Sequence, residues 1–271
     1  MTPVDRKTDA RLQRIVADAI PPPRRIPFDA PWMWLAAGWR DLWRTPALSL
    51  CYGALFALAA ALILFGLARQ QAHALFLALA GGFLLIGPLA AVGLYEASRR
   101  LTTGLTVTLM DMLRAGQRAQ TQLLFFGAIL TFAFLVWMRI AMLLLALFLG
   151  SATVPPPAEF MQALLFTSSG LGLLVTGTFC GGLIAAVIYA GSVVAVPILL
   201  AYRTDPVTAA RASVAAVLAN PRPMVLWSVL IAAMMAAGFA SLLIGLVVAF
   251  PLIGHASWHA FQDLYGDQTR E

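Results

Sequence analysis

Two histidines and an aspartate near the end of the chain have the spacing of metal ligands. In the stretch PLIGHASWHAF, residues 251–261, His255 and His259 are four residues apart, and Asp263 follows at the same interval. On a helix these positions share one face, so two imidazoles beside a carboxylate could bind copper or a haem iron. The alternative is a helix end, because aromatic and polar residues such as Trp258 collect where membrane helices reach the headgroups. We favour the helix end, with no cofactor as the first expectation and haem or copper as the second.

Two other charged residues are candidates for function. Arg139, in LVWMRIAML, is the one charge well inside an apolar run, and Glu96 stands close to Arg99 and Arg100. Charges inside a membrane are functional candidates because an isolated charge in hydrocarbon is costly. Arg139 is expected near the outer boundary, where its long stem can reach the headgroups, so snorkelling or pairing is favoured over transport. For Glu96 we favour an interfacial ion pair over proton transfer.

The composition indicates that membrane helices must position these residues. Of 271 residues, 61% are hydrophobic and 11% are charged, whereas a soluble domain is roughly one quarter charged. The apolar runs can cross a hydrocarbon core of about 30 Å as helices, and they lack the alternation of barrel strands. The net charge is +6, but the basic residues flank apolar runs. This favours anionic lipid headgroups over nucleic acid as the partner.

The order of apolar and polar stretches predicts the helices. Residues 29–45 predict an amphipathic helix capped by Asp29, with an apolar face that suits the headgroup region, formed by Trp32, Leu35, Trp39, Leu42 and Trp43. Spans are expected at about 47–68, 74–98, 122–149 and 172–201. A polar segment follows the second span, and Asp205 opens another amphipathic helix. In the fourth span, small residues spaced for close helix packing are Gly177, Gly181, Gly182, Ala186 and Ala190.

The last apolar run, about 224–262, predicts a hairpin. As one helix it would be nearly 60 Å long, about twice the hydrocarbon thickness, so two helices with a turn near residues 237–241 fit better. The inward spans would then carry similar endings, PLAAVGLYEAS from Pro88, PILLAYRTD from Pro197 and PLIGHASWHAF from Pro251. The predicted fold is therefore an all-α, polytopic transmembrane bundle of about six spans, built as three repeats of amphipathic helix plus hairpin. Five spans remain the alternative.

The distribution of arginine and lysine predicts the orientation. In the six-span version, sixteen of the eighteen Lys and Arg residues lie on the side of both termini, and Arg69 and Arg139 are the exceptions. The positive-inside rule then places both termini in the cytoplasm of a bacterial inner membrane. We expect a flexible cytoplasmic tail at residues 1–28, one transmembrane domain at 29–265 and a short cytoplasmic tail at 266–271.

Several pieces of the chain resemble a known family. They are IPFDAPWMWLAAGWRDLWRTPALSLCYG, GPLAAVGLYEASRRLTTG, NPRPMVLW and PLIGHASWHAF. Over about residues 26–265 the chain resembles a family of proteobacterial integral membrane proteins of unknown function. Some members carry the label cytochrome c oxidase subunit I. A catalytic haem–copper subunit needs ligating histidines on several helices, and this chain has three histidines in total. No catalytic residues are carried over from the family.

Three functions are open at this point. The first is a non-enzymatic inner-membrane protein that organises lipid or a partner, which would be another membrane protein or a second copy of itself. The second is an accessory of a respiratory oxidase that binds haem or copper through His255 and His259. The third is a small-molecule transporter that works around Arg139 and the prolines of the spans, and it predicts a polar cavity at the middle of the bundle.

Overall fold

The described part of the chain is helical. The computed structural model describes residues 20–69, 76–150 and 157–266, and these residues contain helices and turns without a strand. In chain order the helices are α2 (Ala30–Arg44), α3 (Pro46–Arg69), α4 (Phe76–Ala90), α5 (Val92–Thr102), α6 (Leu109–Arg114), the 3-10 turn η2 (Gln117–Ala119), α7 (Gln120–Leu149), α8 (Pro157–Phe166), α9 (Ser168–Ser192), α10 (Ala195–Ala201), α11 (Pro206–Ala219), α12 (Pro221–Ala240) and α13 (Leu246–Tyr265).

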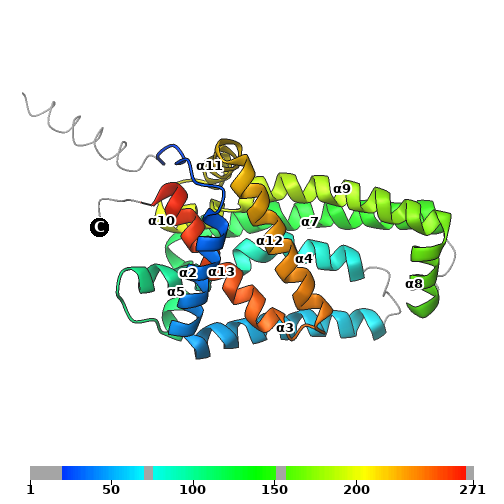
Figure 1. The fold of residues 1–271 in the computed structure, drawn as a ribbon, viewed down its shortest axis with the longest axis horizontal. Helices are drawn as coiled ribbons and strands as arrows, with labels where there is room; N and C mark the ends of the chain where they lie inside the picture. Colours follow the sequence, from blue (N-terminus) through cyan, green and yellow to red (C-terminus); the bar gives the residue numbers. More distant parts are fainter. Residues whose placement is uncertain (1–19, 70–75, 151–156, 267–271) are drawn as a thin grey trace, which may run out of the picture.

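Four helical segments among the described residues are long and apolar enough to cross a membrane. They are Pro46–Arg69, Leu109–Leu149, Ser168–Ala201 and Pro221–Ala240. The predicted helical membrane bundle is therefore confirmed. Helices α4 and α13, which would complete six spans, fall outside this set, so the count of six stays a prediction. The longest pair, α7 and α9, lies side by side and extends beyond the rest of the bundle towards α8 (Figure 1).

The predicted hairpin near the C-terminus is present, with its turn slightly later than expected. Helix α12 continues through Ala240, and the reversal occupies the residues that follow, where Leu242 and Leu243 have φ of 53° and 71°. The Ser241 hydroxyl accepts a hydrogen bond of 2.9 Å from the Gly245 amide. The small residues of this stretch do not end the helix, since Ala237, Gly238 and Ala240 all remain helical.

Two of the three inward segments are divided near their proline. The predicted span at 74–98 is divided into α4 and α5 just after Pro88, and the predicted span at 172–201 is divided into α9 and α10 just before Pro197. Helix α13 continues through Pro251 without a break. Residues of α5, α10 and α13 belong to one buried cluster, so the three segments with similar sequences meet in the core.

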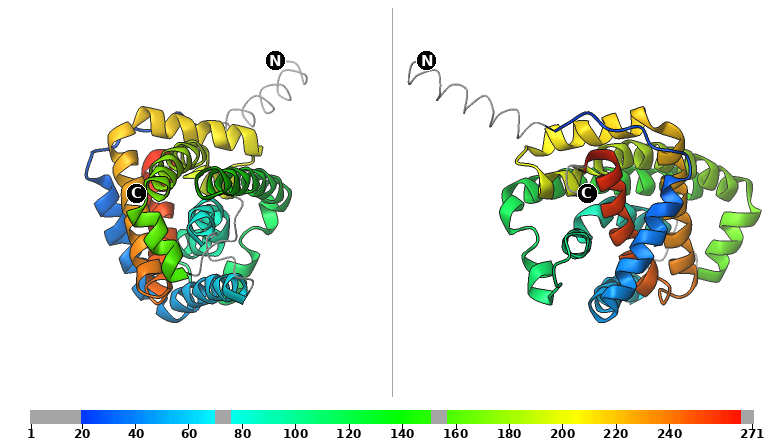
Figure 2. Two further views of the ribbon diagram at one scale, coloured as in Figure 1. Left: turned by 90° about the vertical axis from the view of Figure 1, so that its right-hand side faces the viewer. Right: turned by 60° about the vertical axis from the view of Figure 1, so that its left-hand side comes forward.

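Helix α2 buries the side opposite most of its tryptophans. Trp34, Gly38 and Asp41 lie on one face and are buried, whereas Trp32, Trp39 and Trp43 of the predicted apolar face are about half exposed. Helix α2 packs along α13, and Figure 2 shows it on the outside of the bundle. The exposed tryptophans suit the headgroup region, because an indole ring is apolar and carries one polar N–H.

The segment before α2 is held against the bundle from residue 20 onward. We call residues 20–28 the proline strap. Its Arg24 amide donates to the Leu264 carbonyl at 3.1 Å, and the Arg24 guanidinium donates to the Gly266 carbonyl. The Asn220 side chain accepts from the Ile26 amide at 3.0 Å and donates to the Arg24 carbonyl at 2.8 Å. The flexible tail predicted for residues 1–28 therefore does not include the strap, and residues 1–19 lie outside the described chain.

Candidate functional site

His255 lies in the core and uses both ring nitrogens. Its side chain is fully buried, with Nε2 at 2.9 Å from the Ser49 hydroxyl and Nδ1 at 2.8 Å from the Ser98 hydroxyl. Ser98 donates its one hydrogen to Asp41 at 2.7 Å. It must therefore accept from the imidazole, which places the histidine proton on Nδ1. Nε2 then accepts a hydrogen bond from Ser49.

His259 joins the same group of side chains through Asp41. Its Nε2 atom lies 2.8 Å from Asp41 Oδ2 and donates to that carboxylate. The Thr45 and Ser49 hydroxyls are 3.1 Å apart. Six side chains thus form one polar network that links α2, α3, α5 and α13. Asp41, Ser49, Ser98 and His255 are buried, and Thr45, between α2 and α3, and His259 are partly buried. The network links four helices by directional bonds, where apolar packing alone would allow them to slide.

The network also determines the charge state of Asp41, which lies on α2 outside the spanning segments. Burial of this carboxyl by itself raises its pKa, but the hydrogen bonds from His259 and Ser98 and the nearby imidazoles outweigh burial, so the pKa of Asp41 is lowered below its ordinary value of 3.8. A carboxylate with a lowered pKa stabilises the folded state at pH values above its unfolded pKa. This contribution disappears as the pH falls through the lowered value.

We therefore expect acid to destabilise the protein partly through Asp41. Between about pH 5 and pH 3 the melting temperature in detergent should fall, and Asp41→Asn should reduce the slope of that fall because asparagine does not titrate. The comparison variant is Asp205→Asn. The pKa of Asp205 is also lowered, mainly by Thr208, but at an exposed helix cap, so this variant should reduce the slope by less. An equal reduction of the slope in both variants would contradict the role of Asp41.

The three predicted metal ligands do not meet at one point. The structure joins His255 and His259 through the network, whereas the Asp263 carboxylate accepts a 2.6 Å hydrogen bond from the Trp34 indole. Among the described residues, no group of three or more His, Cys, Asp and Glu side chains is arranged to hold a metal ion. Ligation through Nε2 of His255 would have to displace Ser49, because that lone pair already accepts a hydrogen bond.

Glu96 and Arg139 lie apart from the network and from each other. Glu96 accepts two hydrogen bonds from Arg99, at 2.7 and 2.6 Å, and Arg100 lies 3.2 Å from Asp111. Glu96 is thus an ion-pair member in the middle of α5. Arg139 is exposed on α7, and its snorkelling to the headgroups stays a prediction.

Sequence reasoning missed four members of the network, namely Asp41, Thr45, Ser49 and Ser98. Asp41 falls on the side of α2 opposite most of the tryptophans, in line with Trp34 and Gly38. That position was a usable signal. A carboxylate on the face opposite the tryptophans points towards the protein, where it needs a polar partner. The two serines gave no signal, since isolated serines are ordinary in membrane helices.

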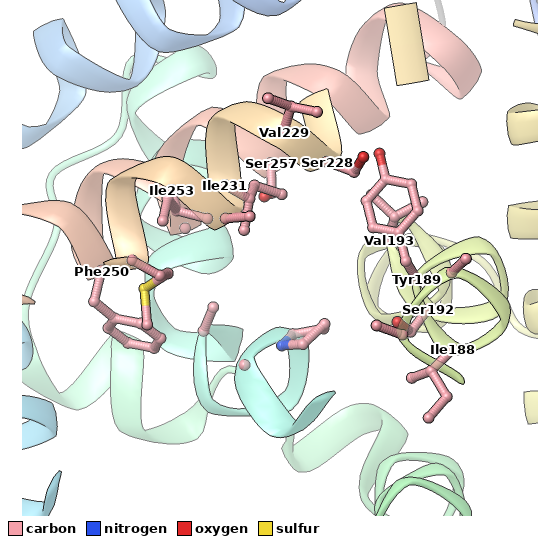
Figure 3. Close-up of a pocket in the computed structure, with 18 of the residues that line it drawn as sticks. Ile188, Tyr189, Ser192, Val193, Ser228, Val229, Ile231, Phe250, Ile253 and Ser257 are labelled. Carbon is pink, nitrogen blue, oxygen red and sulfur yellow. The ribbon is translucent and has the colours of Figure 1, made fainter. Parts of the chain in front are cut away.

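A cavity of about 440 Å³ lies on the other side of α13. Its walls come mainly from α4, α5, α9, α12 and α13, with Phe56 of α3 and Val217 of α11. Its polar side chains are all hydroxyls: Tyr95, Tyr189, Ser192, Ser228 and Ser257. In Figure 3, Phe250, Ile253 and Ile231 lie towards one end of the cavity and Tyr189, Ser192 and Ile188 towards the other. The remaining lining residues are apolar side chains or glycines.

The cavity opens on the side of the bundle between α9 and α12. Lining residues on both helices are exposed: Gly182, Ala185 and Ala186 on α9, and Val225, Val229 and Ala232 on α12. Both helices belong to the segments able to cross a membrane. The opening therefore faces the region that lipid chains occupy.

The small residues predicted to pack α9 against another helix have two roles. Gly181 lies against α7, because a β-carbon there would come within 2.7 Å of the Trp137 ring. Gly182 and Ala186 instead form the cavity wall, and a β-carbon at Gly182 would meet nothing within 4 Å. The predicted close packing is therefore limited to one side of the helix.

Helices of bilayer length with exposed apolar side chains define a multi-pass integral membrane protein. A family model described as "Predicted integral membrane protein (DUF2189)" matches residues 75–201, which include α4 to α10. The predicted resemblance to a membrane family of unknown function is thereby confirmed for this part of the chain. No curated protein and no solved structure matches the chain.

Proposed function

We propose that this protein is a non-enzymatic protein of the bacterial inner membrane that holds a lipid chain in its lateral cavity. The observation that carries the proposal is the apolar cavity itself, which opens between two membrane-spanning segments. Its volume lies within the roughly 300–1,000 Å³ of small-molecule sites. This function is the lipid-organising form of the first hypothesis drawn from the sequence.

The chemistry of the lining favours a hydrocarbon occupant. The Tyr189 hydroxyl donates to the Met224 carbonyl at 2.7 Å, and the Ser228 hydroxyl donates to the Val225 carbonyl at 2.8 Å. These hydrogens are used within the protein, so they offer little to a polar ligand. An apolar cavity is costly when empty, because its lining atoms lose dispersion contacts that a flexible chain can restore.

The cavity lining gives less support to a transporter, and the polar network gives less support to a haem or copper site. Transport of a polar molecule would need polar groups along its path, and the walls of this cavity are mostly apolar. A haem or copper site at His255 and His259 would require the hydrogen bonds to Ser49 and Asp41 to be broken. The cytoplasmic location of both termini follows from the positive-inside rule and is part of the proposal.

Spin-labelled phosphatidylcholine in reconstituted vesicles tests the proposal. The purified protein should give a motionally restricted component in the electron spin resonance spectrum that is larger than the lipid shell around the protein accounts for, because a further chain is held in the cavity. Ala186→Phe should remove most of this excess, because the ring would occupy the space between α9 and α12. Val187→Phe is the matched control, since Val187 is the next residue on α9 and is exposed without lining the cavity. A spectrum unchanged by Ala186→Phe would contradict the proposal.

A further inference from the structure

Two arginines from distant parts of the chain lie at the junction of α11 and α12. Asn220 forms a hydrogen bond there with the Ile26 amide of the proline strap, and the Arg25 guanidinium donates to the Ala219 carbonyl. Arg222 is the second residue of α12. Both arginine side chains are exposed. We call this pair, Arg25 and Arg222, the basic corner.

The basic corner lies one helical turn beyond the cavity. On α12, Arg222, Val225 and Val229 are spaced i, i+3 and i+7, so they share a helix face. Val225 and Val229 line the cavity. Side chains on a helix lean towards its N-terminus, so the Arg222 guanidinium extends away from the cavity and along the surface.

Tyr189 lines the cavity and bridges α9 and α12 near the basic corner. Its hydroxyl bonds to the carbonyl of Met224, two residues after Arg222, and so joins α9 to α12 at this end of the cavity. A chain that enters through the side opening would keep its headgroup outside this bridge. The headgroup would then lie next to Arg222.

We propose that the cavity and the basic corner form one binding site for an anionic phospholipid, with an acyl chain between α9 and α12 and the phosphate-containing headgroup on Arg222 and Arg25. This inference rests on the proposed chain-binding function and adds the class of lipid. Arginine suits this role because its planar fork donates paired hydrogen bonds to phosphate oxygens. An exposed charge pair at the membrane surface also attracts anionic lipid over zwitterionic lipid.

Vesicles that contain either spin-labelled phosphatidylglycerol or spin-labelled phosphatidylcholine separate the two proposals. For the unaltered protein we expect the restricted component to favour phosphatidylglycerol by about fivefold or more, the effect of one basic side chain near the surface. Arg222→Gln should reduce that preference towards one, and Arg222→Lys should keep most of it. The restricted phosphatidylcholine component should be the same in all these variants, which shows that they are folded.

Arg211→Gln is the matched control for general surface charge. Arg211 is an exposed arginine on α11, six residues before the cavity-lining Val217 and on a different side of that helix. Its replacement should leave the preference intact. Equal restriction of the two lipids by the unaltered protein, or equal losses in Arg222→Gln and Arg211→Gln, would overturn the anionic-lipid site and leave the chain-binding function standing. No restricted component beyond the lipid shell for either lipid would overturn both.

Discussion

Replacing His255 by alanine is expected to lower the free energy of unfolding by about 3–5 kcal/mol. The change removes a fully buried side chain and leaves a cavity, which for large core residues costs about 2–5 kcal/mol. It also leaves the Ser49 and Ser98 hydroxyls each without one partner, at about 1–3 kcal/mol for an unsatisfied buried group. These hydroxyls keep their contacts with Thr45 and Asp41, so the second cost is only partly incurred. The measurement is reversible unfolding in mixed micelles.

A double-mutant cycle tests whether the loss comes from the network. His255→Ala and Ser98→Ala should be non-additive by about 0.5–3 kcal/mol, because the two side chains share a hydrogen bond. His255→Ala and Ser228→Ala should be additive, because the Ser228 hydroxyl bonds to its own helix. Additivity of the first pair would show that His255 stabilises the fold by packing alone.

Gly53→Ala is the second substitution with a large expected effect, and its reason lies in Pro251. Proline has no amide hydrogen, so the Val247 carbonyl, four residues earlier on α13, loses its helical hydrogen bond. Gly53 faces this carbonyl, and a β-carbon there would come within 2.1 Å of the oxygen. Because the oxygen belongs to the backbone, α3 and α13 would have to separate. We expect a loss of about 2–3 kcal/mol, at the upper end for overpacking, measured by unfolding in micelles.

Gly66→Ala is the matched control on the same helix. A β-carbon at Gly66 would meet nothing within 4 Å. Alanine is about 1 kcal/mol better than glycine inside a helix, so this variant should be as stable as the unaltered protein or slightly more stable. Similar losses in Gly53→Ala and Gly66→Ala would show that the close approach of α3 to the Val247 carbonyl is not what matters.

The polar network and the cavity therefore both depend on helix α13. It approaches α2 at Gly38 and α5 at Gly254, as it approaches α3 at Gly53. His255 on this helix belongs to the polar network, and Gly254 and Ser257 line the cavity. A change in the network that moves α13 would also move a wall of the cavity.

The length of the membrane-spanning helices could be predicted from the sequence because the bilayer sets it. The spans expected at 47–68 and 122–149 are observed as α3, Pro46–Arg69, and α7, Gln120–Leu149. The C-terminal hairpin was predicted for the same reason, since one helix would have been too long. Pro197 marks a division in the structure, because it has no amide hydrogen to donate to the Val193 carbonyl between α9 and α10. Helix α4 instead continues through Pro88 and ends at Ala90.

The partners of the candidate site could not be predicted from the sequence. The sequence left His255 as a metal ligand or a helix-end residue, whereas the structure places it between Ser49 and Ser98, which are 206 and 157 residues away along the chain. Each serine is ordinary in its own helix, and only the packing of α13 against α3 and α5 brings the three side chains together. The basic corner depends on tertiary structure in the same way, because the strap carries Arg25 to Arg222.

The sequence by itself determined that this chain is a membrane protein and how long most of its spans are, because hydrocarbon excludes water and every backbone amide must bond within its helix. Only the tertiary structure decided which side of each helix faces lipid and which faces protein. In a soluble protein, polar residues mark the outer side of a helix. Here both sides are apolar, so the buried face depends on shape, as at Gly53 and Gly38, and on the few polar side chains that must find one another inside the bundle.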